Sequence, residues 1–464
     1  MHTADAGTIR FGPCCTKRPA EVVSAVGMRL CVRKATLDAN AEKVLISVKL
    51  QLDLTLSADQ KIVTCSPRRS SQPLSQDGVR RASLRSEWTT NATIAILLSM
   101  VFGSPTLAAT SFVYVSNADD GEIATYTLQA DGSLKPGPRI KAEKIVMPMV
   151  VSLDKRLLIA AVRSKPYRAY SYRIDPGSGE LKPVGTAPLA ESFPYISLDR
   201  SGRFLFGASY SANLISVNPV GADGRVGEPL QVVPSARNAH SIHVDYSNRF
   251  VFVPHLGTDQ VFQFLFDERS GRLSANTPPV LQLKQGTGPR HLVVPQDNRF
   301  VYVLNELTGT VTTLALDAGT GLLTELDYVS VLSPETKLLP GMPRGGVGTP
   351  GATPRNTDND IWAADLHLTP NGRFVYASER TTSTIGALRV DGTSGKLTYL
   401  GSTPTEKQPR GFNIDPTGQF MVVAGEKSDL LAVYSIEAES GALKPIGRYP
   451  TGKGANWVEI VSFP

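Results

Sequence analysis

A short pattern that recurs along the chain constrains the fold more than any other feature of the sequence. It consists of an apolar stretch, a turn rich in Asp, Asn and Gly, and a second apolar stretch, as in "HVDYSNRFVFVPHL" from His243 and "HLTPNGRFVYASER" from His367. The second stretch opens at seven positions spaced 45, 47, 46, 50, 74 and 46 residues apart: Phe112, Leu157, Phe204, Phe250, Phe300, Phe374 and Phe420. Repeats of this length are typical of solenoids and propellers.

A glycine turn further along each repeat keeps the same period. Stretches such as "GSGELKP" and "ESGALKP" place turn glycines 47, 45, 47, 50, 74 and 46 residues apart, at Gly132, Gly179, Gly224, Gly271, Gly321, Gly395 and Gly441. Each repeat is therefore expected to form a hairpin, a third strand such as Val261 to Phe266, and a fourth strand after the glycine turn. Four strands per repeat, seven times over, predict an all-β fold, a seven-bladed β-propeller with four-stranded blades.

The first repeat is incomplete, and the end of the chain supplies the missing part. "SFVYVSNA", from Ser111, contains the second strand of a hairpin without the first. "ANWVEIVSF", Ala455 to Phe463, is a strand pattern with no hairpin of its own. We therefore expect the C-terminal strand to complete the first blade and close the ring, which removes an open sheet edge.

The propeller domain is predicted to span residues 110–464, with one long insertion. Residues 332–360, within the 74-residue interval, are rich in Gly, Pro and Thr. Such a composition is typical of a surface loop. Because the loop directly precedes an innermost strand, it either covers one mouth of the central channel or is an insertion without a role.

Two segments precede the propeller domain. We expect residues 1–85 to be a disordered extension, or a reading frame that begins upstream of the true start near Val79 or Leu84. Residues 86–109 follow several arginines and contain "ATIAILLSMVF" and then "GSPTLAATS", the order of a secretory signal. The apolar run is about half of the ~20 residues that span a bilayer, so no stable membrane span is predicted. The location would be periplasmic or secreted, or cytoplasmic if the segment is instead a short helix packed on the domain.

The excess of basic residues belongs to the N-terminal region. Of the 48 Lys and Arg and the 42 Asp and Glu, residues 1–109 hold 14 and 8, so that residues 110–464 hold 34 of each. The propeller therefore carries no signature of nucleic-acid binding. All four cysteines also lie in residues 1–109, which excludes a thiol nucleophile in the propeller. No metal-ligand spacing or cofactor motif is present, so neither a metal nor a cofactor is predicted.

Aligned repeats show which positions vary in chemistry. The residues just before the first strand of a hairpin and just after its second strand meet at the open end of the hairpin. These positions should therefore lie around one mouth of the channel, and they hold His240, His291, Arg163, Arg290, Arg380, Arg410, Asp365, Glu306 and Glu426. Variable polar residues on a repetitive scaffold indicate a binding site, although solvated ion pairs between blades are the alternative. His243 and His367 lie two residues further along and are expected to be channel histidines.

These side chains suit an anionic, oxygen-rich ligand, because arginine binds carboxylate or phosphate in bidentate fashion. The sequence has no nucleophile elbow, so the chemistry on offer is general acid–base catalysis by His240 or Glu306, with arginines stabilising an oxyanion. Hydrolysis of an activated ester such as a lactone needs little more than these groups and a positioned water.

Several motifs resemble those of the propeller-type 6-phosphogluconolactonases, the cycloisomerase 2 or lactonase family related to carboxymuconate cyclases. They include "AHSIHVD", "GTGPRHLV", "VLNELTGTV" and "WAADLHLTPNGRFVYASER", and the resemblance runs from about Phe112 to Phe463. It implies hydrolysis of 6-phosphoglucono-1,5-lactone without a cofactor. The family's proposed site residues fall on His240, Arg290, Glu306 and Arg380, and Arg410 in "QPRGF" is a further motif position. The signal-like segment and the 332–360 loop depart from the family pattern, and a functional signal would favour an unphosphorylated sugar lactone or another lactone instead.

We therefore predict a metal-independent lactone hydrolase acting on 6-phosphoglucono-1,5-lactone or a related sugar lactone. The predicted catalytic residues are His240, Arg290, Glu306 and Arg380. The predicted substrate-binding residues are His291, Arg410, Arg163, Asp365 and Lys407. The alternatives are a carboxymuconate-type cycloisomerase and a non-catalytic periplasmic propeller that binds a ligand or a protein. The oligomeric state is left open.

Overall fold

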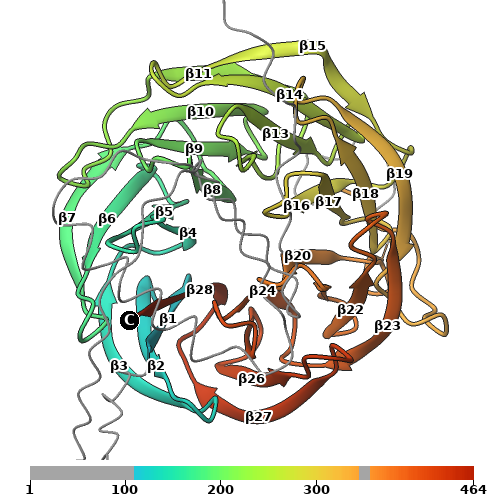
Figure 1. Ribbon diagram of the computed structural model, residues 1–464. Coiled ribbons are helices and arrows are strands. Elements are labelled where there is room, and N and C mark those ends of the chain that lie inside the picture. Colours follow the sequence, from blue (N-terminus) through green and yellow to red (C-terminus); the bar gives the residue numbers. More distant parts are fainter. Residues whose placement is uncertain (1–108, 344–355) are drawn as a thin grey trace, which may run out of the picture. The chain divides into compact units, whose positions relative to one another are not determined.

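The computed structural model describes residues 109–343 and 356–464, and in these residues the chain forms a ring of β-sheets around a central channel (Figure 1). The described part contains 28 strands and no helices, and the strands form seven four-stranded antiparallel sheets. The predicted seven-bladed propeller is confirmed. The predicted extension (1–85) and all but the last residue of the signal-like segment (86–109) lie outside the described residues.

Each blade runs from an innermost strand at the channel to an outermost strand at the rim (Figure 1). The first blade consists of β28 (Ala455–Phe463), β1 (Thr110–Asn117), β2 (Glu122–Leu128) and β3 (Leu134–Lys141). The second blade consists of β4 (Val146–Val151), β5 (Leu157–Val162), β6 (Arg168–Ile174) and β7 (Leu181–Pro188), and the third of β8 (Tyr195–Leu198), β9 (Phe204–Ser209), β10 (Leu214–Pro219) and β11 (Gln231–Pro234). The fourth blade consists of β12 (His243–Val244), β13 (Phe250–His255), β14 (Gln260–Asp267) and β15 (Arg272–Gln282). The last three consist of β16 (Pro289–Val293), β17 (Phe300–Asn305), β18 (Thr310–Leu316) and β19 (Leu323–Ser330); β20 (Ala363–Leu368), β21 (Phe374–Glu379), β22 (Thr384–Val390) and β23 (Leu397–Pro404); β24 (Pro409–Ile414), β25 (Phe420–Gly425), β26 (Leu430–Ile436) and β27 (Leu443–Pro450).

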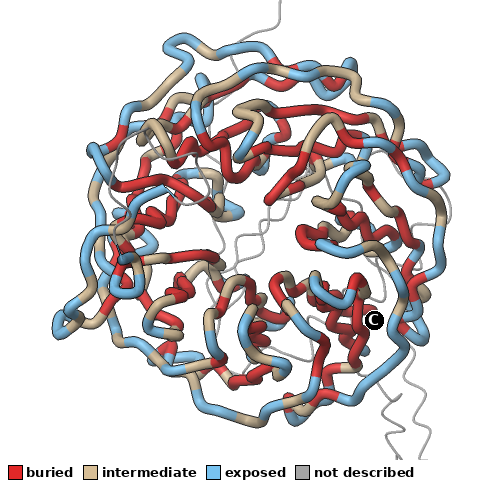
Figure 2. Tube along the Cα trace, turned by 180° about the vertical axis from the view of Figure 1, so that it is seen from behind, coloured by how far each residue is buried: buried red, intermediate tan, exposed pale blue. Residues whose placement is uncertain are grey.

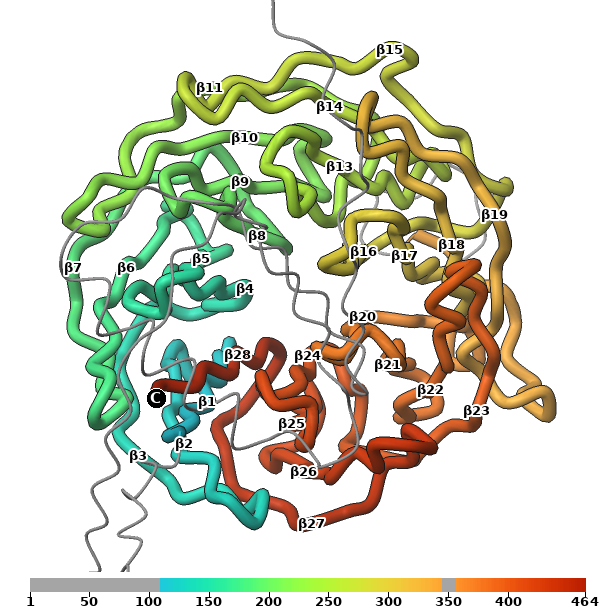
Figure 3. Tube along the Cα trace, in the orientation of Figure 1, coloured from blue at the N-terminus to red at the C-terminus, as the bar shows by residue number. Residues whose placement is uncertain are grey.

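The C-terminal strand closes the ring as predicted. β28 pairs antiparallel with β1, in a register that runs from Thr110 opposite Phe463 to Asn117 opposite Ala455. The two ends of the propeller therefore share one blade (Figure 3). This pairing supplies the innermost strand that the first repeat lacks.

The turn glycine and the residue that opens the second strand of the hairpin recur with the same period because they contact each other between neighbouring blades. Gly271 has a φ of +72°, and a Cβ added to it would lie 2.1 Å from the ring of Phe204 in the preceding blade. The same relationship joins Gly321 to Phe250, and Gly132 to Phe420 across the closure of the ring. A side chain at this turn would collide with the ring, so glycine is needed both for space and for the left-handed backbone.

Burial falls from the channel side to the rim (Figure 2). All six residues of β21 are buried, whereas β23 alternates between partly buried and exposed residues after its first position. The core lies between neighbouring blades; one cluster joins Phe112 of the first blade to Tyr172 of the second. Each such large apolar side chain contributes on the order of 1.5–3 kcal/mol by burial.

The described ends of the inserted loop dock beside the mouth of the channel. Leu339 and Asp360 form a parallel bridge, and Gly341 donates its backbone N–H to the carbonyl of Leu307 at 2.7 Å. Residues 344–355, the middle of this loop, lie outside the described residues. In the described ranges, no helix is long and apolar enough to cross a membrane.

Candidate active site

The fifth blade shows how a hairpin brings two predicted site residues together. Arg290 lies at the start of β16 and Glu306 directly after β17, and Pro289 pairs with Asn305 at this end of the hairpin. Arg290 Nε donates to Glu306 Oε2 at 2.7 Å, and both side chains are almost fully buried. The sequence argument for a shared channel mouth is thus correct for this pair.

Bulges at the start of the innermost strands set the direction of two arginines. The register of β16 with β17 shifts between Pro289 and His291, so that Arg290 is the extra residue. The register of β24 with β25 shifts in the same way between Pro409 and Gly411, with Arg410 as the extra residue. A bulged residue is released from the alternating pattern of the strand, and bulges are frequent beside active sites.

The loop before Arg290 is fixed by glycine and by one aspartate. Gly288 has a φ of +66°, and an added Cβ would lie 2.5 Å from Leu307. The Asp259 carboxylate accepts the backbone N–H groups of Gly286 and Gly288, each at 2.8 Å. The "GTGPRH" motif therefore sets the entry of β16, and with it the position of Arg290.

Arg290 is fully buried, and most of its donors are committed. Its Nη1 donates to Nε2 of His291 at 2.9 Å and also to the carbonyl of Ala364. Within the described residues, its Nη2 has no hydrogen-bond partner. An unsatisfied buried donor on a charged group costs free energy, so such an atom calls for an explanation.

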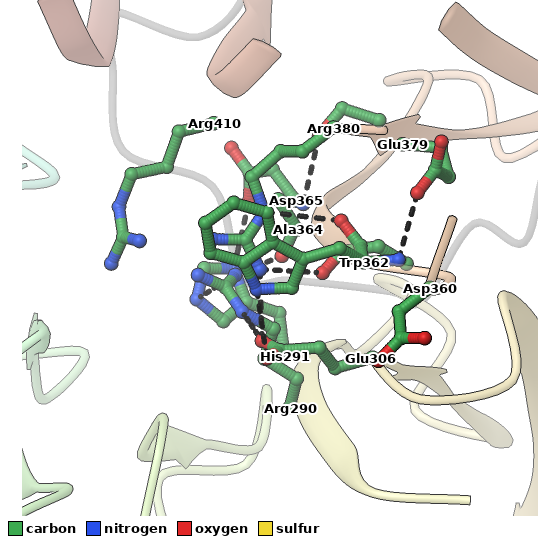
Figure 4. A network of polar contacts seen from close by, with 12 residues as sticks. Arg290, His291, Glu306, Asp360, Trp362, Ala364, Asp365, Glu379, Arg380 and Arg410 are labelled. Carbon is green, nitrogen blue, oxygen red and sulfur yellow. Dashed lines mark hydrogen bonds and ion pairs between the residues drawn. The ribbon is translucent and has the colours of Figure 1, made fainter. Parts of the chain in front are cut away.

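Glu306 connects two arginines and a tryptophan. Besides Arg290, its Oε2 lies 3.1 Å from Nη2 of Arg380. Its Oε1 accepts from the indole Nε1 of Trp362 at 3.2 Å. The guanidinium of Arg380 stacks on the Trp362 ring, 3.7 Å from its centroid, and donates to the carbonyls of Trp362 and Ala363 (Figure 4). Both carboxylate oxygens of Glu306 are thus held by cationic or N–H donors.

His240 lies beside this network with one ring nitrogen unused. The residue is buried, and its ring meets that of His291 edge to face at 5.2 Å between centroids. In the described part of the chain, Nδ1 of His240 has no hydrogen-bond partner. Burial and then the charge of Arg290 hold the pKa of His240 well below its ordinary value, so the imidazole is neutral at neutral pH.

Two residues predicted to bind the ligand, His291 and Asp365, instead hold Arg290 through a chain of hydrogen bonds. His291 Nδ1 contacts Asp365 Oδ1 at 2.8 Å, and its Nε2 contacts Arg290. Asp365 Oδ2 lies 3.2 Å from Nε2 of His367. With both ring nitrogens and both carboxylate oxygens engaged, His291 and Asp365 are placed to orient Arg290.

Of the three remaining predicted cations, two have a polar partner and one is exposed. Arg410 lies 3.6 Å from Glu426, and in Figure 4 its guanidinium stands apart from the network of dashed contacts. Arg163 donates from Nε to the hydroxyl of Ser192 at 3.0 Å. The side chain of Lys407 is exposed.

Several arginines lie close together, which makes the site electropositive, and their charges repel one another. Burial and then the charge of Arg410 lower the pKa of Arg163 and of Arg290 to about 10. Burial lowers the pKa of Arg380 to about 9, against the attraction of Glu306. All three stay protonated at neutral pH, and an anion placed between them and Arg410 would relieve the repulsion.

The structure thus brings His240, His291, Arg290, Glu306, Arg380 and Asp365 into one network, with Arg163 and Arg410 within electrostatic range. Sequence reasoning missed Trp362, although it directly precedes β20 and so occupies the kind of position that was compared. It also missed Tyr195 and Trp457, whose rings pack against His291. Among the described residues, no group of three or more His, Cys, Asp or Glu is placed to hold a metal ion.

Comparisons with known proteins agree with this architecture. The family model "Lactonase, 7-bladed beta-propeller" matches residues 106–460. The 6-phosphogluconolactonase of Pectobacterium carotovorum subsp. carotovorum (strain PC1) is 39% identical over 304 residues, which cover 65% of this chain and 84% of that protein. The 6-phosphogluconolactonase of Serratia proteamaculans (strain 568) is 36% identical over 303 residues, with the same coverage.

A solved structure extends the comparison to three dimensions. The periplasmic gluconolactonase of Pseudomonas aeruginosa matches with a TM-score of 0.66 at 29% identity, over 77% of this chain and all of that one. A putative 6-phosphogluconolactonase from Bacteroides fragilis, with a TM-score of 0.67 at 22% identity over 77% of this chain and 99% of that one, supports the fold. The chain belongs to the seven-bladed β-propeller lactonase family.

Proposed function

We propose that this protein hydrolyses a sugar lactone to the corresponding acid, with 6-phosphoglucono-1,5-lactone as the first candidate substrate and glucono-1,5-lactone as the second. One observation carries the proposal. Two neighbouring buried groups, Nδ1 of His240 and Nη2 of Arg290, each hold an unused hydrogen-bonding position. One is an acceptor or base and the other a cationic donor, which is the pair that addition of water to a carbonyl requires.

In the proposed reaction, neutral His240 removes a proton from water as the oxygen attacks the lactone carbonyl carbon. Arg290 Nη2, assisted by Arg380, stabilises the oxyanion that forms. The tetrahedral intermediate then collapses, the bond between the carbonyl carbon and the ring oxygen breaks, and the protonated His240 returns its proton to that oxygen. The products are the carboxylic acid and the freed hydroxyl, and no metal or cofactor takes part.

Glu306 is less suited to act as the base. Its two oxygens already accept from Arg290, Arg380 and Trp362. A proton on either oxygen would weaken the contacts that hold the two guanidinium groups in place. We therefore assign it the task of holding the two arginines in place.

The electropositive surroundings favour an anionic substrate. Arg410 and Arg163 are the candidates to hold a phosphate or carboxylate, because repulsion between them is relieved by an anion. Lys407, which is exposed, is a weaker candidate. A bound anion would also raise the pKa of His240, which burial and then the charges of the arginines depress, and so make it a stronger base when substrate is present.

The cellular location bears on the choice between the two lactones. We propose that residues 86–109 direct export, that residues 1–85 are not part of the mature protein and that residues 110–464 form the enzyme. One of the related structures is that of the periplasmic gluconolactonase of Pseudomonas aeruginosa. Export would favour the unphosphorylated lactone, whereas the arginine cluster favours the phosphorylated one.

The test is a comparison of hydrolysis rates with and without the purified protein. Acid release from each lactone would be followed in weakly buffered solution against the spontaneous rate. We expect acceleration for at least one lactone, abolished in His240→Ala. Rates equal to the spontaneous reaction for both lactones would contradict the proposal, and turnover of a muconate instead would indicate the cycloisomerase.

A further inference from the structure

Asp365 is the link between two sides of the channel. Its Oδ1 lies 2.8 Å from Nδ1 of His291, which belongs to the network around Arg290. Its Oδ2 lies 3.2 Å from Nε2 of His367, which is not part of that network. His367 instead lines a cavity of about 290 Å³ whose other walls include Leu153 and Asp199, residues of the hairpin turns. The turns lie at the far end of the hairpins from Arg290, so His367 faces the opposite mouth.

The hydrogen bonds fix where the protons lie. A guanidinium can only donate, so Nε2 of His291 must accept from Arg290 Nη1. The proton of neutral His291 is therefore on Nδ1, and this nitrogen donates to Oδ1 of Asp365. The pKa of Asp365 is held well below its ordinary value, so the carboxylate is ionised and accepts on both oxygens, and Nε2 of His367 donates to the second. The second bond of an imidazole decides its tautomer in this way.

A buried carboxylate needs compensation, and His367 supplies it together with His291 and the backbone N–H groups of Leu366 and Phe412. Burial acts to raise the pKa of Asp365, but His367 and His291 together hold it well below its ordinary value. Burial acts to lower the pKa of His367, yet the Asp365 carboxylate outweighs it and the pKa ends above its ordinary value.

The other elements packed around His367 add two titratable groups. Glu459 on β28 faces it, and burial raises the pKa of this carboxyl to about 7. His243 on β12 is kept neutral by burial, with a pKa of about 3. Phe412 on β24 packs its ring edge to face at 4.8 Å between centroids. Asp365 is therefore the main ionised partner of His367 at neutral pH.

We propose that His367 is a positioning residue for the lactonase site, acting from the opposite side of the channel. It holds Asp365 ionised and oriented, Asp365 fixes the ring of His291 by accepting from its Nδ1–H, and His291 anchors Nη1 of Arg290 so that Nη2 stays available to the oxyanion. This role rests on the proposed function for its effect on rate, but the hydrogen bond between His291 Nδ1–H and Asp365 is a property of the folded protein alone.

The role predicts a rate effect with a pH signature. Since Arg290 acts on the transition state, loss of its anchor should lower kcat more than it changes KM. The raised pKa of His367 means that its charge is present below that pKa and is lost as pH rises through it. Wild-type kcat should therefore decline on the alkaline side as His367 deprotonates.

Two variants and one control test the proposal in the full-length protein. His367→Leu removes both the charge and the donor, and we expect kcat to fall between about tenfold and hundredfold, the range typical of a misplaced catalytic group. His367→Gln keeps a neutral donor, so we expect partial recovery of kcat without the alkaline decline. His243→Gln alters the same cavity without a bond to Asp365 and should keep the wild-type pH profile.

A readout independent of turnover accompanies the kinetics. NMR of the imidazoles should show Nδ1 protonated and Nε2 unprotonated for His291 in the wild type, and in His367→Leu a shift of the Nδ1–H proton resonance because its hydrogen bond to Asp365 changes. Wild-type kcat and pH profile in His367→Leu, or an unchanged Nδ1–H resonance of His291 in it, would overturn the proposal. If the wild type hydrolyses no lactone, the proposed function fails, while the NMR result still decides whether His367 positions His291.

Discussion

Arg290 and Glu306 form a buried ion pair across the open end of one hairpin, with 2.7 Å between Nε and Oε2 and side chains 1% and 5% exposed. Glu306 also holds Arg380 at 3.1 Å. Two guanidinium groups are thus kept close together by one carboxylate. This arrangement concentrates positive charge beside the unused nitrogen of His240, and the first prediction follows from it.

Removal of the Glu306 charge should destabilise the protein as well as reduce its activity. Glu306→Ala leaves two buried guanidinium groups without their carboxylate, and breaking a buried pair in this way costs about 3–5 kcal/mol. Thermal and urea unfolding would measure the loss. The control is Glu439→Gln, which breaks an exposed pair with Arg373 and should leave Tm almost unchanged. Equal effects of the two substitutions would contradict a structural role for Glu306.

His240 should dominate the chemical step. We expect His240→Ala to lower kcat by about 10²–10⁴, the usual contribution of a general base, while Tm changes little by comparison with Glu306→Ala. Steady-state kinetics on the lactone that the wild type hydrolyses would measure this. If His240→Ala kept most of its activity and a folded Glu306→Gln variant lost it, Glu306 would be the base instead.

The pH profile of kcat/KM should stay flat to an unusually low pH. Burial and the charge of Arg290 lower the pKa of His240 below its ordinary value. A base works in its unprotonated form, so a lowered pKa moves the acidic decline of kcat/KM to lower pH. The decline of kcat, which reports on the substrate complex, should lie at higher pH when the substrate is anionic. A decline of kcat/KM centred at or above the ordinary pKa of histidine would refute this assignment.

Arg410 should matter for an anionic substrate more than for a neutral one. We expect Arg410→Ala to raise KM for 6-phosphoglucono-1,5-lactone by roughly tenfold to a hundredfold, since a charge-assisted contact contributes about 1.5–3 kcal/mol. The effect on glucono-1,5-lactone should be small. Lys396→Ala is the matched control, because this exposed cation lies in the turn between the two outer strands β22 and β23. Equal changes for both lactones would show that Arg410 does not bind the phosphate.

Deletion of residues 457–464 should abolish stable folding. These residues form most of β28, the strand that pairs with β1 and closes the ring. Without them the first blade loses its innermost strand and exposes an unpaired edge, which invites aggregation. Thermal unfolding and size-exclusion chromatography would measure the effect, with removal of Pro464 alone as the control. A truncated protein with wild-type Tm would contradict the role of this strand in closure.

Much of the site was predictable because a repeat contains its own alignment. The hairpin brings the residue before one strand next to the residue after the other, so Arg290 and Glu306 had to meet. The same comparison placed His240 and Arg380 at the same mouth. It did not separate the residues that face a substrate from those behind them. His291 and Asp365 occupy the same positions as the others in the alignment, yet their hydrogen bonds are spent on Arg290 and His367.

The sequence by itself determined the number of blades, the closure by Ala455–Phe463 and the end of the hairpins at which polar residues gather. Local rules suffice for these, because turn glycines, strand periods and hairpin geometry act over a few residues. Only the tertiary structure decided that bulges at Arg290 and Arg410 redirect these side chains, that Trp362 supports Glu306 and Arg380, and that Asp365 joins the two sides of the channel. Those relationships depend on contacts between blades, where burial, charge and hydrogen bonding combine groups that lie far apart along the chain.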